Sequence, residues 1–354
     1  MLRKFHAIFL AAAMVFALSS TASAAEVPTI GDGTETQEAT VSITKDLVMA
    51  EGIAIPSATF QFEATAVTAD APAARITPIT YPSEATQSVQ ATENGLVKVT
   101  QTSAIQFGTF PHAGVYEYTV KETLYTYNGD GTMAYAADEY LLRVYVANRA
   151  DDSLYIQTIT AEKNGAKQTE VLFTNTYTKD AALTITKATE GTLANKEQDF
   201  EFTIQFTNAA TSTETGFIGQ IDGTELRFPV DQEIKFALHD GQSLTFASLP
   251  AGTRYVVTEL GAEDGYTPSV KVIENGQAAP EKKAAKDGDS LSSLGQNPVG
   301  NLVGEQENKV TFVNTYQEIA ITGIAMNNLP FLLLIGAGVA ALAALSVLKR
   351  KKTH

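Results

Sequence analysis

The sequence predicts an all-β fold in which two β-sandwiches follow one another along the chain. Short runs rich in valine, isoleucine, threonine and aromatic residues are separated by turn sequences such as Asn128-Gly129-Asp130-Gly131, which is typical of sandwich domains. Hydrophobic helix periodicity is absent outside the two termini. One pattern of three strands also occurs twice, and the length of chain between the termini suits two domains.

The expected strands fall into two groups with a short junction between them. The first group covers residues 41–45, 59–67, 97–100, 115–121, 140–147, 154–161 and 171–176. The second covers residues 183–187, 199–206, 243–246, 254–260, 268–273 and 309–315. We place the domains at residues 25–179 and 180–318, joined at residues 178–182. Residues 69–92 are an expected insertion rich in alanine, threonine and proline, and residues 277–307 an expected mobile loop.

The repeated pattern places one polar side chain on the apolar face of each of three strands. Its members in the two copies are Ile-Thr-Lys at 43–45 and 185–187, a strand-ending glutamate at Glu122 and Glu259, and Phe-x-Asn-Thr-Tyr at 173–177 and 312–316. Because side chains alternate along a strand, Lys45 shares a face with Val41 and Ile43, and Asn175 with Phe173. Each copy therefore directs an amine, an acid and an amide toward its core.

These three groups can react with one another in a dry core. Burial disfavours charged forms, so the amine and the acid can both be neutral, and a neutral amine is a nucleophile. The asparagine amide is its electrophile, and the protonated acid can polarise the amide oxygen and relay protons while ammonia leaves. The product is a Lys–Asn isopeptide bond, formed once without turnover, so we expect no enzyme beyond this autocatalytic step. We interpret the triads as Lys45, Glu122 and Asn175, and Lys187, Glu259 and Asn314.

Each of these residues also has an ordinary explanation. A lysine at a strand end often extends to water, a strand glutamate is often solvated, and Asn-Thr is common in turns. Three such positions occur in the same order and with the same face parity in each of two segments, six positions in all, which favours reactive triads.

The motifs at 43–45, 173–177, 185–187 and 312–316 resemble those of Gram-positive pilins, namely the streptococcal pilin isopeptide linkage and collagen-adhesin B-type families. The resemblance covers nearly all of the chain between the termini. It implies two immunoglobulin-like domains of the collagen-adhesin B type, with lysine on the first strand, asparagine on the last and glutamate on a strand between them. The partners it implies are a sortase, identical subunits in a covalent polymer, accessory pilins and peptidoglycan.

Residues 1–24 have the organisation of a cleaved secretion signal. Arg3 and Lys4 precede an apolar stretch at residues 7–18, and Ala22-Ser23-Ala24 supplies the small-residue cleavage site. The alternative, an N-terminal membrane anchor, is disfavoured because the apolar stretch is short.

Residues 319–354 combine Ile319-Ala320-Ile321-Thr322-Gly323, an apolar stretch at 329–348 and a basic tail at 349–352. The apolar stretch is long enough to cross a bilayer, and the basic tail would stay on the cytoplasmic side. The segment resembles a sortase sorting signal, in which the enzyme cleaves between Thr322 and Gly323 and passes the threonine carbonyl to an amine. The usual Leu-Pro-x-Thr-Gly is altered here at its first two positions, and a permanent membrane anchor is the alternative.

Composition excludes several other classes of function. All 40 acidic residues lie between the two terminal segments and the chain carries a formal charge of −15, which argues against nucleic-acid binding and suits a solvated extracellular protein. Cysteine is absent, so disulfides are excluded and cross-links need other chemistry. The four histidines are scattered, and the sequence predicts no metal site and no cofactor.

A polymer also requires a surface lysine that accepts the threonine acyl group of the next subunit. Many pilins present it in Tyr-Pro-Lys-Asn, whereas this chain has Tyr81-Pro82-Ser83-Glu84. Some relatives use a lysine near the last strand of the N-terminal domain, which makes Lys163 and Lys167 the candidates, with Lys163 preferred. The alternative is that both are solvated surface lysines.

The sequence thus predicts a secreted pilus shaft subunit, attached to the cell wall or pilus after a transient membrane intermediate. The alternative is a monomeric, cell-wall-anchored adhesin that binds a host ligand. The missing lysine motif favours the adhesin, whereas the two-domain size and the lack of a separate binding region favour the shaft subunit.

Overall fold

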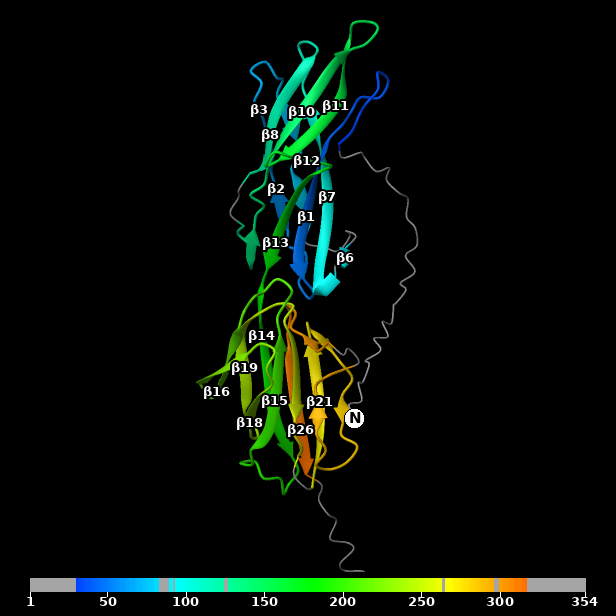
Figure 1. Ribbon diagram of the computed structural model, residues 1–354. Coiled ribbons are helices and arrows are strands. Elements are labelled where there is room, and N and C mark those ends of the chain that lie inside the picture. The colour runs from blue at the N-terminus through cyan, green and yellow to red at the C-terminus, as the bar shows by residue number, and fades with distance from the viewer. Residues whose placement is uncertain are drawn as a thin grey trace, which may run out of the picture.

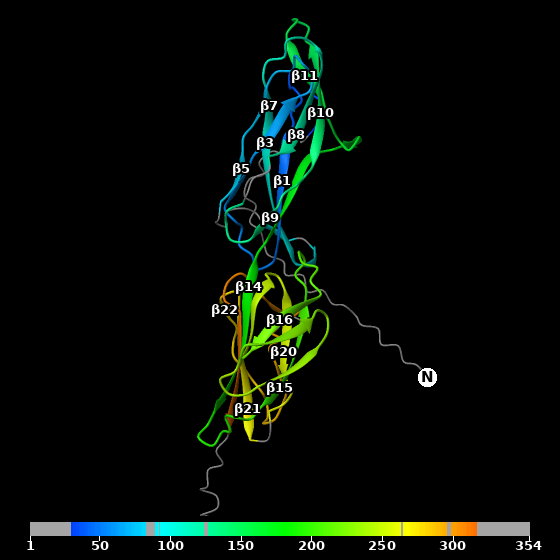
Figure 2. The same cartoon turned by 90° about the vertical axis from the view of Figure 1, so that its left-hand side faces the viewer.

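The computed structural model describes residues 30–82, 89–91, 93–123, 127–262, 265–295 and 299–316. Strands make up nearly all of the regular structure there, and the single helical element described is the short 3-10 turn η1 (Glu93–Gly95). The predicted all-β fold of tandem sandwiches is confirmed. Two elongated domains lie end to end in both views (Figures 1 and 2). No helix among the described residues is long and apolar enough to cross a membrane, and the predicted signal and sorting segments lie outside them.

The N-terminal domain consists of two facing sheets and a small strand pair. Its strands are β1 (Ser42–Ala50), β2 (Ala58–Phe60), β3 (Phe62–Ala66), β4 (Ala74–Ile76), β5 (Ile79–Tyr81), β6 (Val89–Ala91), β7 (Leu96–Phe107), β8 (Gly114–Glu122), β9 (Thr132–Ala134), β10 (Glu139–Asn148), β11 (Leu154–Lys163), β12 (Ala166–Gln168) and β13 (Val171–Thr178). One sheet has the order β4-β7-β1-β13-β9, with β6 also beside β7, and the other has the order β12-β11-β10-β8-β3. Strands β2 and β5 pair separately.

The C-terminal domain repeats the two-sheet construction with different strands at the edges. Its strands are β14 (Asp180–Glu190), β15 (Phe200–Thr207), β16 (Gly216–Ile221), β17 (Thr224–Pro229), β18 (Ile234–Leu238), β19 (Ser243–Pro250), β20 (Arg254–Glu259), β21 (Tyr266–Glu274), β22 (Gln277–Ala278), β23 (Lys282–Lys283), β24 (Leu291–Ser292), β25 (Asn301–Leu302) and β26 (Lys309–Tyr316). The larger sheet has the order β17-β16-β19-β14-β26-β21-β22, with β23 beside β21. The smaller has the order β18-β15-β20-β24, with β25 beside β20.

The first and last strands of each domain are parallel neighbours. In the pairing of β1 with β13, Lys45 lies opposite Phe173, two residues before Asn175. In the pairing of β14 with β26, Lys187 lies opposite Phe312. The register therefore has the same offset in both domains, and it brings each lysine near the asparagine of its neighbouring strand.

Alternation along β8 explains why a glutamate enters the core. Tyr116, Tyr118 and Val120 are buried, while Lys121 is exposed, so the period of two carries Glu122 inward with the apolar residues. The same alternation on β20 buries Glu259. An apolar strand pattern thus fixes the direction of each acid.

The prediction of a mobile loop at residues 277–307 is wrong for the described part of that segment. Ser293 and Asn301 are buried, and the Ser293 hydroxyl donates a hydrogen bond to Asn301 Oδ1 over 2.6 Å. Asn301 Nδ2 donates in turn to Glu274 over 2.6 Å, and Ser293 N–H donates to the carbonyl of Val257 over 2.7 Å. Paired polar groups can be buried without penalty, so a segment of low hydrophobicity packs against β20.

The insertion predicted at residues 69–92 also contains strands. β4 pairs with β7, and β5 pairs with β2. Tyr81 on β5 is fully buried, and its hydroxyl donates a hydrogen bond to the backbone carbonyl of Lys45 over 2.6 Å. This segment therefore supports the strand that carries Lys45.

The two domains are joined almost without a linker. Lys179 alone separates the end of β13 from the start of β14, and the two strands follow one another along the molecule (Figure 1). The Glu305 N–H donates a hydrogen bond to the Gly52 carbonyl over 2.9 Å, and Arg254 forms an ion pair with Glu51. Force applied along the molecule would thus pass directly from one domain to the next.

Candidate functional sites

Lys45, Glu122 and Asn175 meet inside the N-terminal sandwich. The lysine and the asparagine come from neighbouring strands of one sheet, and the glutamate comes from the opposing sheet. Lys45 Nζ donates a hydrogen bond to Glu122 Oε2 over 3.0 Å, and Asn175 Nδ2 donates to Glu122 Oε1 over 2.8 Å. All three side chains are buried. The structure therefore brings the three predicted groups together, while their covalent reaction stays a prediction.

Lys187, Glu259 and Asn314 form the corresponding cluster in the C-terminal sandwich. Lys187 Nζ donates to Glu259 Oε1 over 2.9 Å, and Asn314 Nδ2 donates to the same oxygen over 2.7 Å. The side chains are again buried. An amine, an acid and an amide thus meet in both domains, with the acid between the other two.

Aromatic rings cover the amine in both clusters. Phe60 lies over Lys45 Nζ at 4.7 Å from the ring centre, and Phe200 lies over Lys187 Nζ at 4.2 Å. These residues were missed by the sequence analysis, although Phe-x-Phe occurs at both 60–62 and 200–202. The rings exclude water from the amine, which strengthens its interactions with the acid and lowers the stability of its charged form.

Burial lowers the pKa of Lys45 and of Lys187 from 10.5 to about 8. The main cause is loss of hydration, which destabilises the ammonium group, and contact with Glu122 or Glu259 opposes it. With a pKa of about 8, roughly one-tenth of each amine is neutral at pH 7. The nucleophilic form is therefore populated under ordinary conditions.

The two clusters differ at the asparagine carbonyl. Asn175 Oδ1 accepts a hydrogen bond from the backbone N–H of Ala136 over 2.8 Å. In the described part of the C-terminal domain, Asn314 Oδ1 and Glu259 Oε2 are buried without a hydrogen-bond partner. The C-terminal cluster thus leaves one amide oxygen and one carboxyl oxygen unpaired, whereas the N-terminal cluster pairs its amide oxygen with a backbone N–H.

The predicted linking residues are not brought to the clusters. Thr322 and Gly323 lie outside the described residues. Lys163 ends β11, where its Nζ lies 3.2 Å from Asp138 Oδ1 and its side chain is 31% exposed. The hydrogen bond that Lys163 donates to the Asp138 carboxylate is the main cause that raises the pKa of Lys163. Lys167 is exposed on β12.

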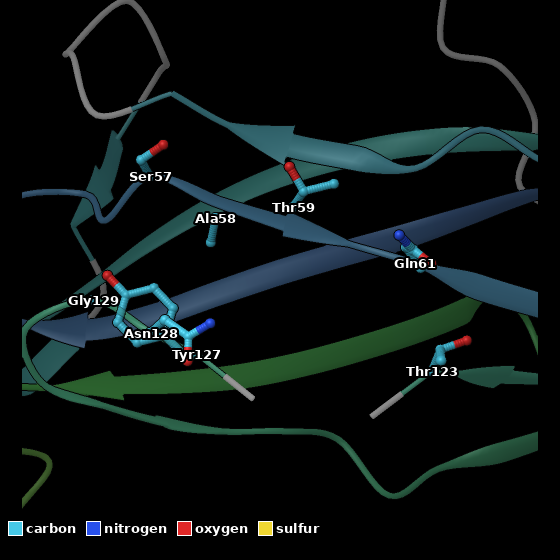
Figure 3. A pocket seen from close by; sticks show the side chains of 8 residues that line it. All are labelled: Ser57, Ala58, Thr59, Gln61, Thr123, Tyr127, Asn128 and Gly129. Atoms are coloured by element: carbon cyan, nitrogen blue, oxygen red, sulfur yellow. The ribbon is translucent and has the colours of Figure 1, made fainter. Parts of the chain in front are cut away.

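Two surface pockets lie near the N-terminal cluster. One of about 470 Å³ lies between residues 57–61 and the segment 127–129, with Tyr127 and Asn128 at its edge (Figure 3). Its lining contains no triad residue. Another of about 400 Å³ is lined by Glu122 and Ala136 together with Glu63, Lys121, Asp138 and Glu139. The second pocket therefore lies beside the residue that carries the acid of the cluster, whose side chain is itself fully buried.

Metal ligands are not grouped among the described residues, since no three histidine or acidic side chains there could hold an ion. His112 pairs with Asp70, and His239 with Asp199, at partly exposed positions. The buried amine–acid–amide clusters are thus the principal concentrations of reactive groups in the described chain.

Comparisons with known proteins agree with this construction. Residues 41–178 match the Spy0128-like isopeptide containing domain, and residues 181–316 match a domain of unknown function, DUF7601. A pilin of Streptococcus pyogenes serotype M1 is 27% identical over 263 residues, which cover 72% of this chain and 72% of that protein. These matches support a Gram-positive pilin.

Two further proteins to which this chain is similar also come from Streptococcus pyogenes. The pilus tip adhesin Cpa of Streptococcus pyogenes is 39% identical over 104 residues, which cover 29% of this chain and 14% of that protein. The crystal structure of the Streptococcus pyogenes major pilin is 23% identical and covers 79% of this chain and 99% of that chain, with a TM-score of 0.35. The homology to pilins supports a structural pilus subunit at the cell surface.

Proposed function

We propose that this chain is the shaft subunit of a covalent pilus, in which each domain is closed by one Lys–Asn isopeptide bond. The observation that supports the proposal most strongly is the recurrence of one buried cluster, with one strand register, in both domains. A buried lysine, glutamate and asparagine are each costly to place in a core. Their repetition is explained if the three groups react.

The reaction follows from the positions of the three groups. The neutral amine of Lys45 attacks Asn175 Cγ, and a carbon–nitrogen bond forms. Glu122 contacts both nitrogens, so it can take a proton from the lysine nitrogen and deliver one to the amide nitrogen. The Cγ–Nδ2 bond then breaks and ammonia leaves. Lys187, Glu259 and Asn314 react in the same way.

We propose that ammonia leaves through the pocket beside Glu122. This pocket lies beside Glu122 and Ala136, and its lining carries the acids Glu63, Asp138 and Glu139. Ammonia that reaches this acidic opening would be protonated and lost to water. Escape of ammonia makes the reaction irreversible under ordinary conditions.

A cross-link at this position suits a subunit that carries tension. The bond joins the first and last strands of a domain, so force entering on one strand passes to the other through covalent bonds. Most of the domain then lies outside the loaded path, and its hydrogen-bonded ladders are not sheared. The chain segment between the domains, residues 175–187, consists almost entirely of β13 and β14.

Polymerisation would join Thr322 of one subunit to a surface lysine of the next. Lys163 and Lys167 lie on the β11–β12 hairpin, where Glu162 pairs with Lys167 and Lys163 with Ala166. Both amines therefore lie on one edge hairpin of the N-terminal domain. A sortase is the required partner, and accessory pilins and peptidoglycan are further proposed partners.

An immunoblot tests polymerisation. Wall material released by a muralytic enzyme and boiled in SDS should show a ladder of high-mass species that contain this chain. Replacing Thr322-Gly323 should abolish the ladder. Of the two variants Lys163→Arg and Lys167→Arg, the one that removes the linking lysine should also abolish it. Lys235→Arg is the matched control, because Lys235 is exposed on the C-terminal domain.

A single band near the monomer mass would contradict the shaft proposal. It would favour the second candidate, a wall-anchored adhesin present one copy at a time. The match to a pilus tip adhesin over 104 residues is the observation that favours this candidate.

A further inference from the structure

A backbone N–H is directed at the carbonyl group that would react in the N-terminal domain. Ala136 lies between β9 and β10, is 9% exposed, and donates its N–H to Asn175 Oδ1 over 2.8 Å. β9 pairs with β13 through Ala134 opposite Thr176. This pairing carries the following residues past the asparagine side chain.

Packing against the cluster holds this segment in place. The ring of Tyr135 packs against Phe60, with ring centres 6.2 Å apart, and Phe60 is the ring that covers the amine of Lys45. Ala136 itself lines the pocket beside Glu122. The N–H donor and the ring over the nucleophile thus belong to one packed unit.

We propose that the Ala136 N–H is an oxyanion donor that accelerates formation of the Lys45–Asn175 bond. The inference rests on the proposed isopeptide reaction. When Lys45 Nζ bonds to Asn175 Cγ, the carbonyl oxygen gains negative charge before the Cγ–Nδ2 bond breaks and ammonia leaves. A fixed N–H at hydrogen-bond distance from that oxygen, in a buried site, stabilises the charge without reorganisation.

The C-terminal domain lacks this donor among its described residues. Asn314 Oδ1 is buried without a hydrogen-bond partner there. The developing charge on Asn314 Oδ1 therefore has no backbone donor among the described residues. The two bonds should therefore form at different rates, with the Lys45–Asn175 bond first.

Replacement of the Ala136 N–H by an ester oxygen tests the proposal. Lactic acid at this position keeps the methyl group and removes the donor. Because the chain has no cysteine, residues 25–318 can be assembled in denaturant by ligation at alanine positions and desulfurisation, which restores the natural sequence. Dilution starts folding, and mass spectrometry of proteolytic peptides follows the loss of ammonia at each site with time.

The ester should slow the Lys45–Asn175 bond by about 10²–10³-fold, the usual effect of losing one oxyanion donor. The Lys187–Asn314 bond in the same molecules serves as the internal control and should keep its rate. Lactic acid at Ala137, which is exposed, is the matched control and should change neither rate. Near-UV circular dichroism of the tyrosines reports whether the N-terminal domain has folded.

An ester at Ala136 that folds and forms the Lys45–Asn175 bond at the natural rate overturns the proposal. If the ester prevents folding, the rates of the two bonds are compared in the unmodified chain. The proposal requires its Lys45–Asn175 bond to form faster than its Lys187–Asn314 bond. Ammonia loss at neither site of the unmodified chain would instead overturn the proposed function.

Discussion

A single molecule of this chain stretched between its two ends should show no domain unfolding. Force that enters beyond Asn314 crosses to Lys187, follows β14 and β13 to Asn175, and crosses to Lys45. The strands between each pair of cross-linked residues bear no load. Extension would require rupture of a covalent bond, so the force–extension curve measured by atomic force microscopy should lack unfolding steps up to detachment.

Glu259→Ala should restore extension of the C-terminal domain alone. Without the acid the Lys187–Asn314 bond does not form, and the segment between these residues becomes extensible at about 3.3–3.6 Å per residue, or roughly 400 Å in total. Glu201→Ala is the matched control, because Glu201 lies on the neighbouring strand β15 with an exposed side chain. Unfolding steps in the unmodified chain would contradict the predicted cross-links.

Loss of one isopeptide bond should cost about 5 kcal/mol of unfolding free energy for its domain. The bond closes a loop of more than one hundred residues, and a cross-link of that span restricts the unfolded chain by about 4.7 kcal/mol on the loop-entropy account. Asn314→Ala removes the electrophile and leaves Lys187 paired with Glu259. Denaturant titration should therefore show a much earlier transition for the C-terminal domain in this variant.

The pH dependence of the Asn314→Ala variant identifies the free amine. Lys187 has a pKa of about 8 in the fold against the ordinary value of 10.5, so between these values the unfolded chain binds more protons than the folded one. Unfolding free energy should then rise as pH increases from about 8 to 10.5, and should stay level below that window with respect to this group. The double variant Asn314→Ala/Lys187→Met should not show this rise in unfolding free energy between about pH 8 and 10.5. If the Asn314→Ala variant were as stable as the unmodified chain, the predicted Lys187–Asn314 cross-link would be contradicted.

Strand periodicity was sufficient to predict the composition of both clusters. Apolar residues occur at a spacing of two along the strands that carry Lys45, Glu122 and Asn175. Because this spacing fixes the face on which a side chain lies, the three polar groups share the apolar face of their strands. Register and sheet order were not contained in the local pattern. They depend on pairing between segments distant in the sequence. The resemblance supplied only the order of the strands that carry the three groups.

The parts that sequence reasoning missed have physical causes. The Ala136 donor is a main-chain group on a connecting segment, and no side-chain motif marks such a group. The segment at 277–307 was predicted as mobile because it is polar, yet Ser293 and Asn301 are buried through hydrogen bonds that composition does not reveal. Phe60 and Phe200, by contrast, could have been found from the repeated Phe-x-Phe motif.

The central claim is that each domain closes itself with one Lys–Asn bond, and the intact mass of the purified mature chain tests it most directly. The account predicts a mass lower than that of the sequence by two ammonia molecules, with Glu122→Ala and Glu259→Ala each restoring one. Proteolysis should also yield branched peptides that join Lys45 to Asn175 and Lys187 to Asn314. A mass equal to that of the uncross-linked sequence would contradict the claim.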